Sequence, residues 1–169
     1  MATAPSLVSF DEYMRTSYSP DCEYVDGVLL ERNVGQGKHA YTQGEILLAL
    51  QEQLSPKGLM ALVELRVRVA HRRVRVPDIC VIGQLEETVT IPPRLCVEVL
   101  SPDDRWTRVN ASIRDYQFMG VPCIWVVDPY SSRAWIFEDD NPPLEVTDGL
   151  LFAERLGIQV KLEDVLPKL

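Results

Sequence analysis

The chain has 169 residues, near the usual size of one domain, and 46% of them are apolar, which is enough for a substantial core. The formal net charge of −8 disfavours strong non-specific binding of nucleic acid, whereas an acidic protein suits a cation. The first residues form no secretion signal and no run of roughly 18 apolar residues occurs, so we expect one cytoplasmic domain over residues 1–169 without a membrane span.

The N-terminal third predicts a helix, a hairpin and a second helix. Ser9 followed by Glu12 has the form of a capping box, so a short helix begins there. Asp26-Gly27 lies between two short apolar runs and is a strong signal for a two-residue hairpin turn. Apolar residues at helical spacing over 46–54 then predict the second helix.

The next segment changes to the two-residue period of a half-buried strand pair, with its turn near His71 and Arg72. Four arginines of this pair are expected on its outward face: Arg66, Arg68, Arg73 and Arg75. They can contact phosphates, or they can form a solvated face that pairs with Glu64 and other acids. The second interpretation is favoured, because no aromatic residues alternate with the arginines.

The C-terminal half predicts a further strand, a helix and more strands. The run from Arg94 to Leu100 is apolar, and Ser101-Pro102 looks like the capped start of a helix. That helix should carry Trp106 and Tyr116 on its apolar stripe. Strands are expected over 124–128, 134–138 and 150–153, and a helical turn over 162–166.

These elements indicate an α/β (α+β) fold, a mixed central sheet flanked by helices, with an extra N-terminal hairpin and extra C-terminal strands. The strand over 134–138 is expected to be exposed and able to support a homodimer. The tryptophans Trp106, Trp125 and Trp135 are interpreted as core. The cysteines lack C-x-x-C spacing, so core thiols are favoured over a zinc site or disulfides; they are Cys22, Cys80, Cys96 and Cys123.

Two acidic residues interrupt runs that otherwise predict buried strands. Asp78 lies in Val-Pro-Asp-Ile and Glu98 in Val-Glu-Val-Leu. A buried charge is costly without a partner, so the two acids either share a Mg²⁺ or Mn²⁺ ion or pair with arginines of the neighbouring hairpin. The backbone carbonyl of Val99 can supply a further metal ligand. On spacing alone both interpretations stay open.

A series of short motifs runs in order through most of the chain. The motifs are Glu23–Gly27, Val76–Ile79, Val97–Arg105, Tyr116, Gly120–Pro122 and Trp125–Pro129. Together they resemble the Uma2 family of restriction endonuclease-like proteins over roughly residues 9–138. The resemblance implies the PD-(D/E)xK nuclease fold, DNA as partner, Asp78 and Glu98 as metal-binding acids, and Glu23 as a third acid near the site.

One position departs from the family pattern. The resemblance implies a lysine four residues before Tyr116, and this chain has Ser112 there. Serine supplies neither a cation nor a useful base. Arg108 lies one helical turn earlier on the same face and can stabilise negative charge, but it cannot act as a general base. His39 falls where the family has a histidine and is interpreted as a surface or capping residue.

Two function classes follow. The first is a metal-dependent endonuclease that retains its acidic ligands but has lost the catalytic lysine. The second is a catalytically inactive member of the fold that binds protein or nucleic acid. A hydrolase with a serine or cysteine nucleophile is disfavoured, because no motif such as G-x-S-x-G occurs.

Overall fold

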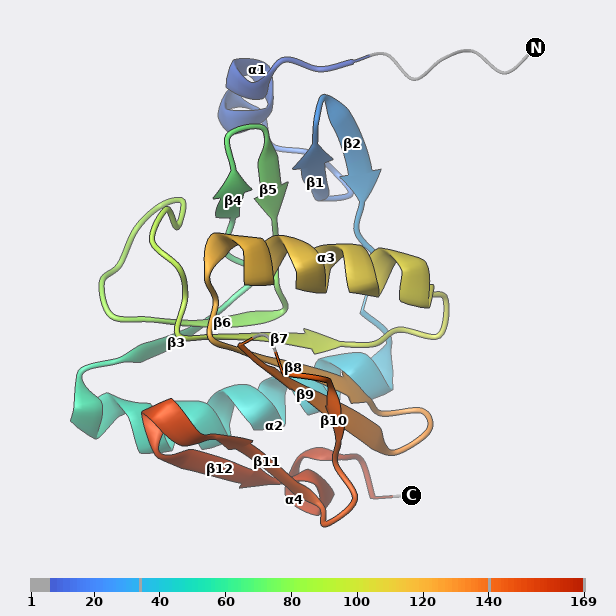
Figure 1. Cartoon of the computed structure of the whole chain (residues 1–169). Helices are drawn as coiled ribbons and strands as arrows, with labels where there is room; N and C mark the ends of the chain where they lie inside the picture. Colours follow the sequence, from blue (N-terminus) through green and yellow to red (C-terminus); the bar gives the residue numbers. More distant parts are fainter. Residues whose placement is uncertain (1–6, 34, 140, 169) are drawn as a thin grey trace.

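The computed structural model describes residues 7–33, 35–139 and 141–168. Figure 1 shows a central sheet between two helices, with helix α3 (Trp106–Met119) on one face and helix α2 (Gly37–Leu54) on the other. A smaller sheet with helix α1 (Phe10–Arg15) lies beyond α3, and a C-terminal hairpin lies beside α2. This is the mixed sheet flanked by helices that the sequence predicted. No helix in these residue ranges is long and apolar enough to cross a membrane.

The central sheet has its strands in the order β10-β9-β8-β7-β6-β3, with β7 and β8 parallel and the other pairs antiparallel. Its strands are β3 (Met60–Val63), β6 (Ile79–Ile82), β7 (Leu95–Val99), β8 (Cys123–Asp128), β9 (Arg133–Glu138) and β10 (Leu144–Glu145). Alternate residues of β7 pack against α2 and against α3, so both faces are buried. Burial on both faces explains the continuous apolar runs of the sequence.

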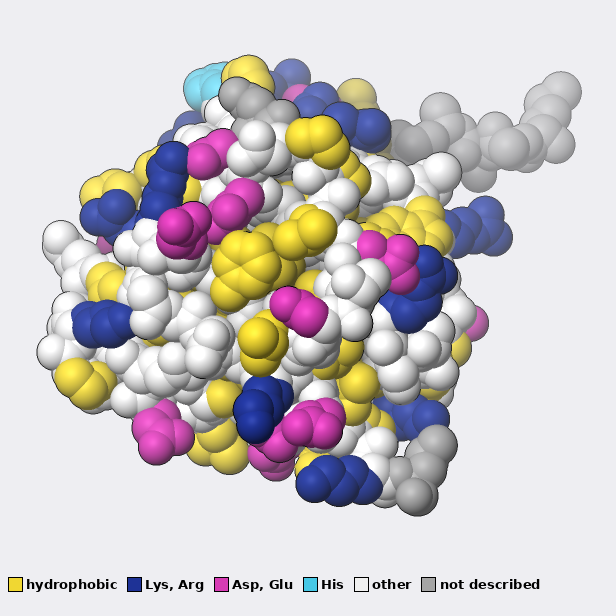
Figure 2. All heavy atoms as spheres, turned by 60° about the horizontal axis from the view of Figure 1, so that its bottom comes forward, with side chains coloured by type: hydrophobic (Ala, Val, Ile, Leu, Met, Phe, Trp, Pro, Cys, Tyr) yellow, Lys and Arg dark blue, Asp and Glu magenta, His cyan; other side chains and the backbone are white. Residues whose placement is uncertain are grey.

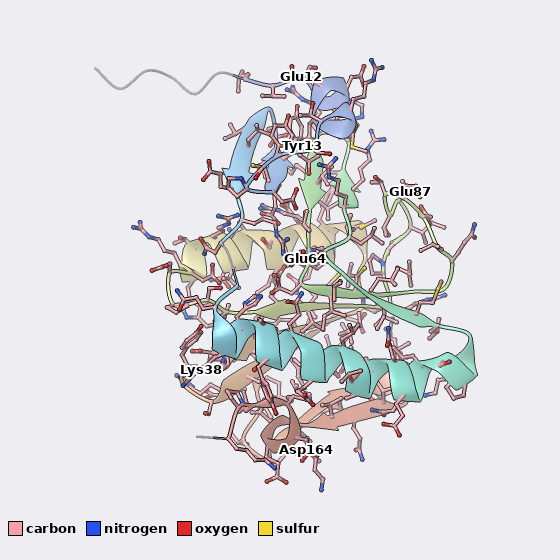
Figure 3. All side chains as sticks on the ribbon, turned by 180° about the vertical axis from the view of Figure 1, so that it is seen from behind. Glu12, Tyr13, Lys38, Glu64, Glu87 and Asp164 are labelled. Atoms are coloured by element: carbon pink, nitrogen blue, oxygen red, sulfur yellow. The ribbon has the colours of Figure 1, made fainter. Side chains whose placement is uncertain are left out.

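The smaller sheet has the order β2-β1-β5-β4, and its strands are β1 (Cys22–Val25), β2 (Val28–Glu31), β4 (Val67–Ala70) and β5 (Arg73–Arg75). The hairpin of β1 and β2 turns at Asp26-Gly27, as predicted, with both residues at positive φ. The Ser9 Oγ accepts the Glu12 backbone N–H at 3.2 Å, which confirms the predicted helix start. Tyr13 of α1, labelled in Figure 3, packs against Tyr24 of β1.

The four arginines of the second hairpin do not share a face, which corrects the sequence interpretation. A bulge between Val67 and Ala70 shifts the β4–β5 register, and a one-residue shift turns side chains to the opposite face. The Arg66 and Arg68 guanidiniums therefore lie over the rings of Tyr13 and Phe10. The two arginines of β5 point the other way, toward α3.

The C-terminal part forms its own hairpin and closes the α2 face of the core. It consists of β11 (Leu150–Ala153), β12 (Ile158–Lys161) and α4 (Leu162–Val165), with the short 3-10 turns Ser55–Lys57 and Glu154–Leu156 at its border. The four cysteines are free and buried, as expected for core thiols. Strands β3, β10 and β12 were not predicted.

Three further predictions are wrong in detail. Residues 101–105 form a turn, and α3 begins only at Trp106, because the Asp104 carboxylate accepts the Ser101 N–H and holds the turn closed. Trp106 is 43% exposed and packs edge-on against Trp135. Strand β9 is not a free edge, since β10 pairs with its middle residues.

The conformation of the hairpin turn favours glycine, whereas that of helix α2 does not, so replacing a glycine should have opposite effects on stability at the two places. Gly27 has φ +101° and a Cβ there would lie 3.1 Å from Leu7, whereas Gly44 lies in a helix with open space around it. We expect Gly27→Ala to destabilise the protein by about 1–2 kcal/mol and Gly44→Ala to stabilise it by about 0.5–1 kcal/mol. Urea denaturation measures both, and shifts of the same sign in the two variants would contradict the structure.

Candidate active site

The register of the central sheet brings the two strand acids together. Ile79 of β6 pairs with Val97 of β7 in antiparallel register, so the next position on each strand sets Asp78 opposite Glu98. Both side chains leave the sheet on the face that carries α3, at the end near the smaller sheet. Adjacent strands thus supply two carboxylates from positions 20 residues apart in the sequence.

Asp78 is almost fully buried and its carboxylate has partners on both oxygens. Its Oδ2 accepts the Val99 backbone N–H at 2.7 Å. Its Oδ1 accepts an N–H from the Arg32 guanidinium at 3.1 Å and lies 3.6 Å from the His39 Nε2. The chain therefore surrounds one buried charge with a backbone donor and two basic side chains.

Glu98 has a different environment from Asp78. Its Oε1 accepts the Tyr116 hydroxyl at 2.6 Å. Burial raises the pKa of Glu98 well above its usual value, and the charges of Asp78 and Glu23 raise it further. Burial also raises the pKa of Tyr116. That hydroxyl therefore keeps its proton and donates a hydrogen bond to the carboxylate of Glu98.

Glu23 belongs to a chain of buried ion pairs that joins the smaller sheet to α3. In β1, Tyr24 faces α1, so Glu23 points to the opposite side, where Arg75 of β5 donates to its Oε2 at 2.9 Å. Arg75, only 3% exposed, also donates to Asp115 of α3 at 2.7 Å. The Arg108 Nη2 lies 3.6 Å from the same Glu23 oxygen.

These side chains border a small cavity of about 60 Å³. Its lining includes the sequence-predicted residues Glu23, Asp78, Glu98, Val99, Arg108 and Ser112. At about 10–15 Å³ for each water, the cavity has room for roughly four waters or for an ion with part of its hydration shell. Ser112 is buried and faces the cavity one helical turn before Tyr116.

Sequence reasoning missed several residues of the cavity. His39 is buried beside Asp78 and its Nδ1 lies 3.3 Å from the Ser101 Oγ, so it is neither a surface nor a capping residue. Arg32 enters from the end of β2 and is also 3.8 Å from Glu64, which Figure 3 shows between the smaller sheet and α2. The Asp104 carboxylate accepts the Asn33 side-chain amide. Placement just after a strand was the only signal for Arg32.

The donor set of the cavity suits a hard cation. Among the residues that the structure describes, no three His, Cys, Asp or Glu side chains form a ready-made metal cluster. A metal here would instead draw on Asp78, Glu98 and a backbone oxygen such as that of Val99, which are oxygen donors of the kind Mg²⁺ and Mn²⁺ prefer. Burial is the largest cause of the raised pKa of Glu98, and the charges of Asp78 and Glu23 add to it, so a cation beside this carboxyl group would favour its ionised form.

Comparison with solved structures identifies the fold. The chain resembles the crystal structure of "a putative nuclease belonging to DUF820 from Anabaena variabilis ATCC 29413", with a TM-score of 0.84, 23% sequence identity, and coverage of 94% of this chain and 97% of that chain. A likeness at this identity shows a common fold, here the restriction endonuclease-like fold expected from the sequence. A search of curated proteins found no significant match.

The family is shown by the sequence itself. Residues 10–169 match the profile of Uma2, whose description is "Putative restriction endonuclease". The chain therefore belongs to the Uma2 family, and the match extends the resemblance from the central motifs to the C-terminal end.

The buried ion pairs predict a large stability effect. Replacing Arg75 with methionine leaves Glu23 and Asp115 buried without their shared cation, and we expect a loss of about 3–5 kcal/mol in the free energy of unfolding. The matched control is Arg133→Met, which removes an exposed pair with Glu145 and should leave that free energy nearly unchanged. Equal losses in the two variants, measured by urea denaturation, would contradict the role of Arg75.

The environment of His39 predicts a shifted titration. Burial lowers the pKa of His39, but the nearby carboxylate of Asp78, together with the charge of Asp104, raises it above its usual value of 6.5. The stability from this pair is therefore complete below about pH 6.5 and is lost as the pH rises through the folded-state pKa. In an NMR titration, Asp78→Asn should lower the pKa of His39, and an unchanged pKa would contradict the contact.

Proposed function

We propose that this chain is a divalent-metal-dependent endonuclease that hydrolyses phosphodiester bonds in DNA, with slow turnover. Asp78, Glu98 and the Val99 carbonyl hold Mg²⁺ or Mn²⁺. The observation that carries the proposal is the position of Asp78 opposite Glu98 on adjacent strands, combined with the raised pKa of Glu98. Membership of the Uma2 family, whose description is "Putative restriction endonuclease", supports the same reaction class.

When bound, the metal ion supplies Lewis-acid polarisation of a phosphoryl oxygen and a lowered pKa for a coordinated water. The protein's own residues hold the acids in place. Tyr116 fixes one oxygen of Glu98, and the Val99 N–H fixes one oxygen of Asp78. Glu23 positions Arg108 at the mouth of the cavity, where a guanidinium can meet a phosphate oxygen.

The slow turnover follows from the residue at the lysine position. Ser112 faces the cavity but carries no charge, so it neither orients a nucleophilic water electrostatically nor neutralises the transition state. Arg108, one turn away on α3, supplies a positive charge and no general base. We propose that it replaces only the electrostatic part of the missing lysine.

A second function is favoured by one specific observation. Arg32 and His39 already surround the Asp78 Oδ1, and they neutralise this acid without any metal. A family member that binds nucleic acid or protein and does not cleave would have the same contacts. Metal binding separates this function from the first.

We further propose a cytoplasmic location and a homodimer. Four free, buried cysteines fit a reducing compartment, in agreement with a cytoplasmic protein. The homodimer is proposed because proteins of this fold often pair. Its interface would lie away from β9, because β10 pairs with the middle residues of that strand.

The first test measures metal binding and DNA nicking together. We expect Mn²⁺ to bind the wild-type protein in calorimetry and supercoiled plasmid to be nicked in its presence, because the two acids and a carbonyl form an oxygen site. Asp78→Asn should abolish both, and Asp164→Asn, an exposed acid of α4, should abolish neither. Equal nicking by wild type and Asp78→Asn, with no heat of Mn²⁺ binding, would exclude the enzyme.

The second test concerns the lysine position. Ser112→Lys should raise the nicking rate by about 100-fold, since it restores a charge beside the reacting phosphate. Arg108→Ala should lower the rate by a similar factor, whereas Arg155→Ala, an exposed arginine near the C-terminus, should not. Absence of an effect from both Ser112→Lys and Arg108→Ala would contradict the assigned roles.

A further inference from the structure

A second, much larger opening lies on the neighbouring flank of α3. It has a volume of about 780 Å³, against about 60 Å³ for the cavity at the acids. One wall is the tip of the smaller sheet, and the floor is a stripe of α3 formed by Ala111, Arg114 and Phe118, which follow at helical spacing. Figure 1 shows α3 passing beneath the smaller sheet. We refer to the opening as the α3 cleft.

The α3 cleft is basic although the protein is acidic. Four arginines line it against two aspartates, in a chain of net charge −8. Asp26 and Asp115 are both occupied by the arginines of β5. Arg72 and Arg114 are exposed and, within the described part of the chain, make no ion pair with an acid. On the face shown in Figure 2, by contrast, acidic and basic side chains are interspersed.

An aromatic ring completes the α3 cleft. Phe118 is 82% exposed, an unusual state for a phenylalanine, and lies one turn beyond Arg114. Arginines that bind phosphates next to a ring that stacks a base are the two elements of single-strand nucleic acid recognition. An acidic peptide would use the arginines but has no need of an exposed ring.

The α3 cleft adjoins the candidate active site, because lining residues of one contact or neighbour lining residues of the other. Arg75 lines the cleft and donates to Glu23, which lines the small cavity. Asp115 of the cleft follows Ser112 of the cavity by one helical turn. The two openings therefore lie on either side of one wall of ion pairs.

From these observations we infer that the α3 cleft binds a single-stranded stretch of the nucleic acid substrate, with its phosphates on Arg72 and Arg114 and a base stacked on Phe118. The inference rests on the proposed function for the identity of the ligand. The cleft provides room for the part of the strand next to the scissile phosphate. The small cavity, at about 60 Å³, cannot hold that part of the strand. The inference also assigns a role to the basic hairpin, whose other arginines are used in structural contacts.

The test measures binding of a fluorescein-labelled twelve-residue oligothymidylate by anisotropy, in EDTA, so that no cleavage occurs. We expect Arg72→Gln and Arg114→Gln each to reduce the slope of log K against log salt by about 0.7, because each removes one phosphate contact to a single strand. The matched control is Arg94→Gln, an exposed arginine elsewhere, with an unchanged slope.

The ring is tested by two substitutions at one position. Phe118→Leu should weaken binding about tenfold, because it keeps the apolar contact and loses stacking, whereas Phe118→Trp should retain it. Unchanged affinity and salt slope in the arginine and leucine variants would overturn the inference. So would tighter binding of a polyglutamate peptide than of the oligonucleotide, since that result assigns the cleft to an acidic protein.

The two proposals fail separately. Asp78→Asn is expected to bind the oligonucleotide as wild type does, because Asp78 lies outside the α3 cleft. If the cleft variants lose binding while neither the wild type nor any variant cleaves DNA, the cleft assignment stands and the endonuclease is excluded. If wild type cleaves DNA and the cleft variants bind and cleave normally, only the cleft assignment is excluded.

Discussion

The buried guanidinium of Arg75 is the contact on which the rest of the structure depends. It lies between Glu23 of the smaller sheet and Asp115 of α3, and both acids are themselves buried. Removing these charges from water is costly, so the pairing favours one arrangement of the two layers over others. Because α3 also carries Tyr116, Arg108 and Ser112, the same ion pairs position the helix over the strand acids.

The candidate active site contains acids that the fold brings close to one another. It also contains cations that partly balance the negative charge of these acids. The central sheet sets Asp78 opposite Glu98 through its register alone, and Glu23 adds a third carboxylate nearby. Basic groups reach this cluster from three elements outside the central sheet: Arg32 after β2, His39 of α2 and Arg108 of α3. A site of this kind holds a metal only if the cation replaces part of the existing neutralisation.

The sequence predicted the elements whose signals are local, together with the pairing of the strand acids. The Asp26-Gly27 turn, the Ser9 cap and the interrupted strands at Asp78 and Glu98 are all encoded within a few residues. The positions of His39 and Arg32 were not predictable, because both reach Asp78 from distant segments and neither spacing nor period records such contacts. The split of the four arginines onto two faces depended on a bulge, which alters the register without an obvious sequence signal. Helix α3 started later than expected because a side-chain turn at Asp104 replaced the helical cap.

The central claim is that Asp78 and Glu98 share a divalent metal, and a crystal structure grown with Mn²⁺ tests it most directly. We expect one anomalous peak within bonding distance of both carboxylates and the Val99 carbonyl, with the Arg32 guanidinium displaced from the Asp78 Oδ1. A structure at saturating Mn²⁺ with no peak between the two acids, and with Arg32 still 3.1 Å from Asp78, would contradict the claim.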